Sequence, residues 1–351
     1  MNLSLDHNSV EALAAKLGEK WPAILAARDQ CRTHVDKLRE RVQKLRPPAN
    51  TSVIAFGSLA REEWTSGSDV DWTLMIDGPA DMGHFDVAKS VEEMLKEEKY
   101  QEPGSTGTFG SMSSSHELVH HIGGSEDTNH NITRRVLMLL ESISLSDAVT
   151  HERVIRAILA RYIVGDPPAT SPAKFHVPLF LFNDIVRFWR TLTVDYATKK
   201  WQRSNAEWAL KNTKLRMSRK LLFAKGMLLC FLCDEEFAGK PENLEFVDVE
   251  LLEYCFRLSR RSAIDLLSWG LLHFACDETA RTVMRAYNNF LATLDDAKKR
   301  DHLKQLEFGN ADDPIFDEQR KNSRAFHDGL ETFFFDSNER LGKLTRRYGV
   351  F

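Results

Sequence analysis

The stretch from Val53 to Ile76 constrains this chain more than any other. It opens with the apolar run VIAF, which has the length and content of a buried strand, and Gly57 and Ser58 end this run. A polar segment able to make two helical turns follows, and a second strand-like run begins at Asp69. Glycine allows a tight backbone turn, and a serine with the next free N–H groups can face an anion at a helix start. The stretch therefore predicts a strand, a turn, a short helix and a second strand.

Two aspartates stand two residues apart in the second strand-like run. On a strand Asp69 and Asp71 point to one face, while Val70, Trp72 and Leu74 point to the opposite, apolar face. Neighbouring carboxylates repel each other unless a positive charge lies between them, and Mg²⁺ prefers such oxygen ligands. An anion-binding turn beside a carboxylate pair matches metal-assisted nucleotidyl transfer. The plainer alternative is a surface turn followed by a strand with solvated aspartates.

This arrangement resembles the nucleotidyltransferase superfamily related to DNA polymerase beta. The signature of that superfamily is Gly-Ser, a spacer, and then Asp-x-Asp between hydrophobic residues; here Gly57-Ser58 is followed by ten residues and Asp69-Val70-Asp71-Trp72. The resemblance implies that Asp69 and Asp71 bind two Mg²⁺ ions, or Mn²⁺, about 3.5–4 Å apart. It implies that Gly57 and Ser58 position the β- and γ-phosphates. The reaction would move an NMP or dNMP from a nucleoside triphosphate, such as ATP, to an acceptor hydroxyl and release pyrophosphate.

The segment HELVH, residues 116–120, admits two interpretations. On a helix, His116 and His120 would face one zinc ion and Glu117 would be the general base of a metallohydrolase. Against this, the preceding residues are loop-like, Gly123 and Gly124 follow almost at once, and no third ligand is evident from the spacing. The segment reads equally well as a strand over 117–122.

The second interpretation makes Glu117 the third carboxylate of a nucleotidyltransferase site. Within the superfamily the chain looks most similar to the PII-protein uridylyltransferase branch, where an acidic residue leads into a hydrophobic strand, a glycine and a helix with arginine and leucines. Here that pattern is Glu117-Leu118-Val119, Gly123-Gly124 and NITRRVLMLLES. The resemblance implies that Glu117 ligates one metal and favours deprotonation of the acceptor. The chain departs from the pattern in having glutamate where aspartate is more usual.

The second half of the chain reads as helical, with no convincing strand after residue 177. Residues 199–225 carry nine lysines or arginines against one acidic residue. On a helix Lys211, Lys214 and Ser218 line up, and enzymes of this superfamily usually complete their cleft with such a helical lobe. We therefore predict that these three residues bind the nucleotide. The alternatives are a solvated basic face, or a groove for a nucleic-acid acceptor with Trp208 as a stacking platform.

These patterns predict an α+β protein with a small mixed β-sheet nucleotidyltransferase core, flanking helices and an all-helical C-terminal lobe. The expected units are an N-terminal helical arm over 1–48, a catalytic core over 49–165 and a C-terminal domain over 175–351. The Gly- and Pro-rich run at 165–172 is the expected boundary, and the Gly-, Ser- and Thr-rich run at 103–114 is expected to be a loop.

Composition narrows the class of protein. The net charge of −4 argues against indiscriminate nucleic-acid binding. No apolar run approaches the ~20 residues of a membrane span, and the N-terminus lacks a signal-peptide pattern. Five scattered cysteines fit a reducing compartment. We therefore expect a cytoplasmic enzyme with no membrane association.

The sequence leaves the acceptor open. The uridylyltransferase resemblance implies a tyrosine on a partner protein, which would receive a uridylyl or adenylyl group. Another nucleotide as acceptor would give a cyclic or linear oligonucleotide signal of the kind used in bacterial defence. The downstream hydrolase and sensor modules of the PII-modifying enzymes have no room here, which tilts the expectation toward oligonucleotide or stand-alone transfer. The chain could also bind a protein partner or form a homo-oligomer. A further alternative is an inactive nucleotidyltransferase fold that serves as a binding module or as half of a toxin–antitoxin pair. Intact Asp69 and Asp71 disfavour this inactive fold.

Overall fold

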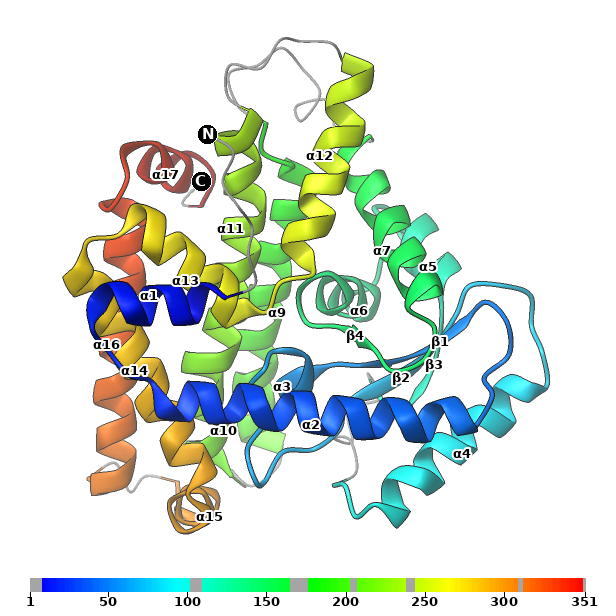
Figure 1. The fold of residues 1–351 in the computed structure, drawn as a ribbon, viewed down its shortest axis with the longest axis horizontal. Helices are drawn as coiled ribbons and strands as arrows, with labels where there is room; N and C mark the ends of the chain where they lie inside the picture. Colours follow the sequence, from blue (N-terminus) through cyan, green and yellow to red (C-terminus); the bar gives the residue numbers. More distant parts are fainter. Residues whose placement is uncertain are drawn as a thin grey trace.

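One small sheet lies among many helices (Figure 1). The computed structural model describes residues 8–101, 109–164, 176–202, 207–237, 244–308 and 312–349. The sheet has the order β3-β2-β1-β4, with β1 antiparallel to both of its neighbours and β2 parallel to β3. Its strands are β1 (Thr51–Ala55), β2 (Trp72–Ile76), β3 (Ser111–Ser114) and β4 (Ile143–Ser144). The predicted small mixed sheet is confirmed.

Strand β1 shows why both faces of this sheet are covered. Val53 and Ala55 pack into one core with α2 (Pro22–Lys44) and α4 (Gly83–Glu97). Ile54 and Phe56 point the other way, into the large core that also holds the apolar faces of α6 (Asn129–Leu140) and α7 (Ala148–Ile163). Residues of a strand alternate between faces, so an apolar run such as VIAF requires helices on both sides. Figure 1 shows α2 along one side of the sheet and α6 on the other.

The remaining elements are helical, and no strand occurs in the described ranges after residue 176. Helix α1 (Ser9–Leu17) lies at the N-terminus, and α3 (Gly57–Ala60), α5 (Ser115–His120) and α6 (Asn129–Leu140) lie between strands in the chain. Helix α7 (Ala148–Ile163) follows the last strand. The C-terminal lobe contains α9 (Leu179–Gln202), α10 (Trp208–Lys214), α11 (Lys220–Phe237), α12 (Leu244–Ser259), α13 (Ala263–Phe274), α14 (Asp277–Asp295), α15 (Ala297–Gln305), α16 (Pro314–Phe335) and α17 (Glu339–Leu344), with π-helical turns η1 (Leu215–Arg219) and η2 (Thr345–Gly349). The predicted helical lobe is confirmed. No helix within the described ranges is long and apolar enough to cross a bilayer.

The N-terminal helices pack on the C-terminal lobe rather than standing apart. Helix α1 lies against α13, and α2 lies against α14. The backbone N–H of Ser9 donates to Asp265 Oδ1 at 3.0 Å. Arg28, buried on α2, bonds Glu11 at 2.8 Å and Glu62 at 2.9 Å. One apolar core therefore runs through the N-terminal helices, the segment that holds the sheet and the C-terminal lobe, and the division into three units stays a prediction. Its proposed boundary at 165–172 lies outside the described residues.

Buried Lys225 on α11 ties three chain segments together. Its ammonium donates to the carbonyl oxygens of Leu140 at 2.7 Å, Ser259 at 2.8 Å and Arg261 at 2.6 Å. Leu140 and Ser259 end α6 and α12, so Lys225 satisfies helix-terminal carbonyls that would otherwise be buried without donors. Burial lowers the pKa of Lys225 to about 7. The three acceptors oppose that change, because only the ammonium form offers three N–H donors.

One local prediction was wrong, and the structure decides two features that the sequence left open. Residues 111–114, expected in a loop, form β3 because they pair with β2 at the sheet edge, where backbone hydrogen bonds override the weak strand propensity of serine. The segment after it is helix α5 rather than a strand over 117–122, and Ser114 caps its N-terminus by accepting from the N–H of His116. The polar segment after Gly57 makes one helical turn, α3, not two.

Candidate active site

The two aspartates stand where β2 begins. The backbone N–H of Phe56 donates to the carbonyl oxygen of Asp71 at 2.8 Å, which extends the pairing of β1 and β2 by one step beyond the strands. Val70, Trp72 and Leu74 are buried in the core beneath α2 and α4. By alternation, Asp69 and Asp71 face the opposite side, toward the C-terminal lobe.

Gly57 and Ser58 border this carboxylate pair. Gly57 has φ +67°, and a Cβ built on it would lie 2.5 Å from Asp71 Oδ2, so no side chain fits there. Ser58 Oγ is buried without a hydrogen-bond partner in the described part of the chain. A buried hydroxyl without a partner costs stability unless a ligand completes it. The turn therefore brings the backbone at Gly57 close to Asp71, and the next residue carries a buried hydroxyl without a partner.

The electrostatics of the pair fit a cation. Burial and the charge of Asp69 raise the pKa of Asp71 to about 7, while Arg219 and Arg61 oppose the rise. A carboxylate with this environment is destabilised when ionised, and a divalent ion with oxygen ligands relieves that cost. Asp69 and Asp71 are the residues that would hold such an ion.

Four cationic side chains interact electrostatically with the aspartates. Burial lowers the pKa of Lys214 to about 8, and the charge of Asp69 acts in the opposite direction, which places Lys214 within electrostatic reach of Asp69. The negative charge of Asp69 also acts on Arg300 of α15 and favours its charged form. Arg300 donates a hydrogen bond of 3.0 Å to Thr65 Oγ1, in the loop that leads to the aspartates. The charges of Arg61 and Arg219 act on Asp71. The cations come from four separate segments: the end of α3, α10, η1 and α15.

Buried acids hold two of these arginines in place. Glu141, fully buried just before β4, accepts hydrogen bonds from Arg61 and, at 3.1 Å, from Arg219. Glu63 accepts from Arg61 Nε at 3.0 Å and from the hydroxyl of Tyr287. Both acids accept hydrogen bonds from these arginines. We therefore assign Glu141 to positioning the guanidinium groups of Arg61 and Arg219, and Glu63 to positioning that of Arg61.

Sequence reasoning missed most of this cluster. Arg219 belongs to the basic stretch at 199–225, and Arg61 lies in the spacer of the Gly-Ser and Asp-x-Asp pattern, so both had a weak signal. Arg300 contacts Thr65 across 235 residues of sequence, and no local pattern marks such a contact.

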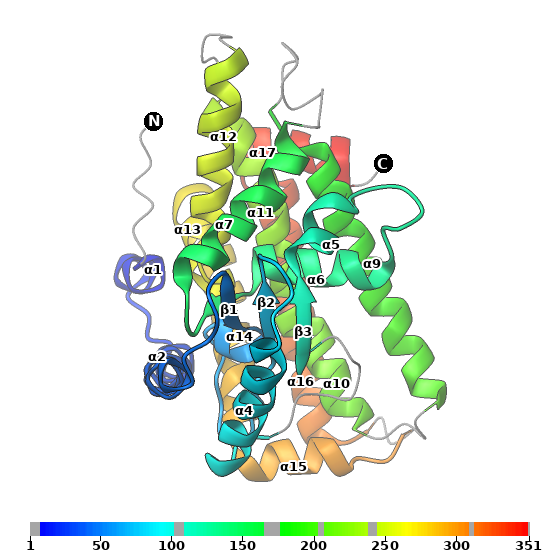
Figure 2. The ribbon, with the colours of Figure 1, turned by 90° about the vertical axis from the view of Figure 1, so that its right-hand side faces the viewer.

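Glu117 lies away from the aspartates. Strand β3 is parallel to β2 and pairs Ser111 with Thr73 and Ser114 with Ile76. The aspartates precede β2, whereas Glu117 follows β3, so the two stand at opposite ends of these strands. Figure 2 shows α5 beyond the carboxyl end of β3, with α10 and α15 toward the other end. The prediction that Glu117 joins Asp69 and Asp71 as a third metal ligand is not supported by this geometry.

The lobe residues predicted to bind nucleotide are in different surroundings. Lys214 borders the aspartates, within reach of the charge of Asp69. Lys211 is 43% exposed and pairs with Glu207 at 3.3 Å. Ser218 is buried and hydrogen bonds with Tyr287. Trp208 packs edge-on against Phe308 and Phe316, with ring centroids 5.4 and 4.7 Å away, so its ring is part of the lobe's aromatic packing.

The HELVH segment does form a helix. On α5 the rings of His116 and His120 are 4.7 Å apart, and His121 is 5.6 Å from His116. Within the described ranges the cluster able to offer three ligand atoms to one metal is elsewhere, at His327, Asp328 and Glu331 on α16. A zinc site at HELVH therefore lacks a third ligand among the described residues.

A matched set of substitutions tests these placements. Glu117→Gln and His116→Ala are each expected to leave the transfer rate within about threefold of wild type, because neither side chain reaches Asp69 or Asp71. The measurement is steady-state turnover, with zinc content determined on the same samples. A loss of more than about a hundredfold in Glu117→Gln would restore Glu117 to the site. Stoichiometric zinc that disappears in His116→Ala would favour the metallohydrolase.

A comparison with protein families gives one match. Residues 35–112 match the family described as nucleotidyltransferase domain. The searches of curated proteins and of solved structures gave no match. The matched segment includes Gly57, Ser58, Asp69 and Asp71, and it ends before Glu117. The resemblance to the nucleotidyltransferase superfamily is confirmed, and the uridylyltransferase branch stays a prediction.

Proposed function

We propose that this chain, which carries a nucleotidyltransferase domain at residues 35–112, transfers a nucleoside monophosphate from a nucleoside triphosphate to an acceptor hydroxyl and releases pyrophosphate. One observation carries the proposal: Asp71 packs against Gly57, beside Asp69, and the charges of four basic side chains act on this pair. The pair of acids suits a divalent cation, and the four basic side chains suit a triphosphate.

One group of residues would bind the negatively charged triphosphate, and the two aspartates would bind the metal cation. Lys214 and Arg300 lie near Asp69 and would bind phosphate oxygens, which offsets the charge of the triphosphate and of the departing pyrophosphate. Ser58 Oγ would donate to a phosphate oxygen, which would give this buried hydroxyl its missing partner. Asp69 and Asp71 would hold a divalent ion, Mg²⁺ or Mn²⁺, which when bound neutralises phosphate charge and lowers the pKa of the acceptor hydroxyl.

Two lysines one helical turn apart give a controlled test of the triphosphate contact. Lys214→Ala is expected to weaken binding of a nucleoside triphosphate about tenfold, since it removes a half-buried charge next to Asp69. Lys211→Ala removes an exposed lysine already paired with Glu207, and it is expected to change affinity less than about twofold. Titration calorimetry with a non-hydrolysable triphosphate measures both. Equal effects of the two substitutions would contradict the assignment.

The acceptor decides which kind of nucleotidyltransferase this is. The uridylyltransferase resemblance depended on Glu117, which stands at the other end of the sheet from the aspartates, so we favour a nucleotide or other small acceptor over a partner protein. The candidate product is then an oligonucleotide signal, cyclic or linear.

The deciding experiment uses each α-labelled NTP and dNTP with Mg²⁺, with the protein alone and with cell lysate. Label in a soluble ladder or small product supports a nucleotide acceptor. Label on a protein band supports nucleotidylylation of a partner. Asp71→Asn serves as the blank, and label transfer that is equal in wild type and blank would contradict the proposed function.

A further inference from the structure

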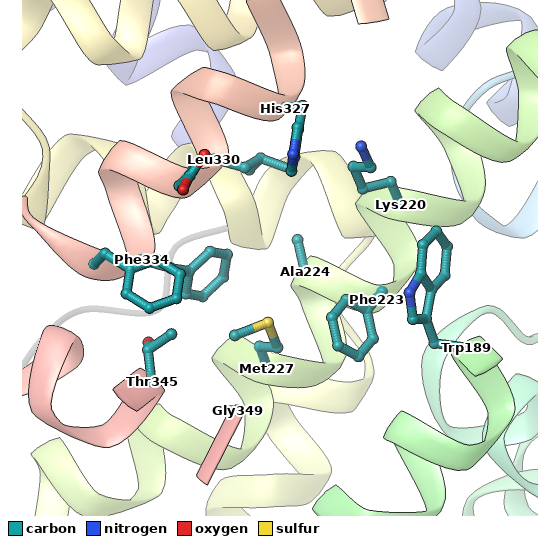
Figure 3. A pocket seen from close by; sticks show the side chains of 12 residues that line it. Trp189, Lys220, Phe223, Ala224, Met227, His327, Leu330, Phe334, Thr345 and Gly349 are labelled. Carbon is teal, nitrogen blue, oxygen red and sulfur yellow. The ribbon is translucent and has the colours of Figure 1, made fainter. Parts of the chain in front are cut away.

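A cavity separate from the aspartates lies in the C-terminal lobe between α9, α11, α16 and η2. Its volume is about 290 Å³. The wall is largely apolar and aromatic, and Trp189 and Phe223 stack along one side with ring centroids 5.4 Å apart. Phe334 and Met227 face into the space from the other side and from below (Figure 3).

The cavity is open to solvent on one side, where His327 and Glu331 are exposed, and its volume limits the size of a ligand. An engineered cavity of about 150 Å³ holds one benzene. A volume of about 290 Å³ is therefore suited to a ligand of roughly two fused rings.

The charges that line the cavity are of opposite sign and come from different helices. Lys220 begins α11, and Glu331 lies on α16. Neither side chain forms an ion pair with any residue that the structure describes. His327, one turn before Glu331, also lines the space. A ligand with both an anionic and a cationic group could pair with the two helices at once.

We propose that this cavity is a binding site for a zwitterionic aromatic molecule of the size of an aromatic α-amino acid. The fused ring would lie between the Trp189–Phe223 pair and Phe334. The carboxylate would face Lys220 and the ammonium would face Glu331. Size selects the ring, and the two charges select the head group.

Four small molecules with one ring system separate these contributions. L-Tryptophan carries both charges, indole-3-propionate carries the carboxylate alone, tryptamine carries the ammonium alone, and indole carries neither. Titration calorimetry on the full chain is expected to show tryptophan as the tightest of the four. Each charge removed from the ligand is expected to weaken binding about three- to tenfold.

Charge variants identify the partner of each group. Lys220→Gln is expected to weaken tryptophan and indole-3-propionate while leaving tryptamine and indole unchanged. Glu331→Gln is expected to do the reverse, weakening tryptophan and tryptamine. Lys321→Gln, an exposed position on α16 that does not line the cavity, is the matched control.

A filling variant tests the location. Ala224→Phe places a ring in the space from the α11 wall and is expected to abolish binding of all four molecules. Its fold is checked by thermal unfolding, and if it fails to fold the two glutamine variants carry the test alone. Binding of none of the four by the wild-type chain would overturn the proposal. So would affinities that do not depend on the charge of the ligand or on Lys220 and Glu331. None of these measurements depends on nucleotidyl transfer.

Discussion

Asp71→Asn is expected to lower the rate of nucleotidyl transfer by about 10²–10⁴-fold while leaving the fold intact. The substitution keeps the shape of a side chain that packs directly against Gly57, so the turn is preserved. It removes one of the two negative charges that would hold a divalent ion, and loss of a metal ligand or proton acceptor costs this order of magnitude in rate. Asp69→Asn is expected to behave alike. Asp86→Asn, at an exposed position on α4, is the control and should retain wild-type turnover.

The same variant carries a prediction about stability. The folded-state pKa of Asp71, about 7, lies above its ordinary value of 3.8, so between these pH values the folded chain binds more protons than the unfolded chain. Stability contributed by this site is therefore lost as pH rises from about 4 to about 7. Metal-free Asp71→Asn has no such loss and is expected to unfold at a higher temperature than metal-free wild type at pH 8. At pH 5 the difference should be small.

Magnesium supplies the complementary measurement. Wild type should gain thermal stability on addition of Mg²⁺ at pH 8, because the ion stabilises the ionised pair and binds the folded state. Asp71→Asn should gain much less. If the metal-free wild type is the more stable protein at pH 8, the assignment of repulsion between Asp69 and Asp71 is wrong.

Lys225→Met is expected to lower the free energy of unfolding by about 3–5 kcal/mol. Methionine fills a similar volume, but it leaves the carbonyl groups of Leu140, Ser259 and Arg261 buried without their donor. Each buried group left without a partner costs about 1–3 kcal/mol. Leu140 ends α6 beside the sheet and Ser259 ends α12 in the lobe, so the substitution loosens the contact between these two parts as well as the local structure.

Urea denaturation followed by circular dichroism measures this effect. Lys343→Met is the control, because Lys343 is 65% exposed and pairs with Glu339 one turn earlier. A change within about 0.5 kcal/mol is expected there. Equal midpoints for the two variants would show that Lys225 does not join the three segments.

Short-range patterns are enough to identify Asp69 and Asp71 as a carboxylate pair at a candidate site. The alternation of Val70, Trp72 and Leu74 with Asp69 and Asp71 puts both carboxylates on one face, because side-chain direction on a strand follows from backbone geometry alone. Gly57 is recognisable for the same reason. Its positive φ and its contact with Asp71 are requirements that a glycine meets without strain.

The side chains around Asp69 and Asp71 are brought there by long-range contacts, which no periodic pattern in the sequence marks. Local sequence allows strand or helix for HELVH, and only the parallel pairing of β3 with β2 shows that Glu117 lies away from the aspartates. The same holds for Arg300, which reaches Thr65 across 235 residues. The sequence by itself thus determined the carboxylate pair and its turn, since these follow from neighbouring residues. The tertiary structure decided which cations and acids surround the pair, because strand register and helix packing bring together side chains that no local pattern connects.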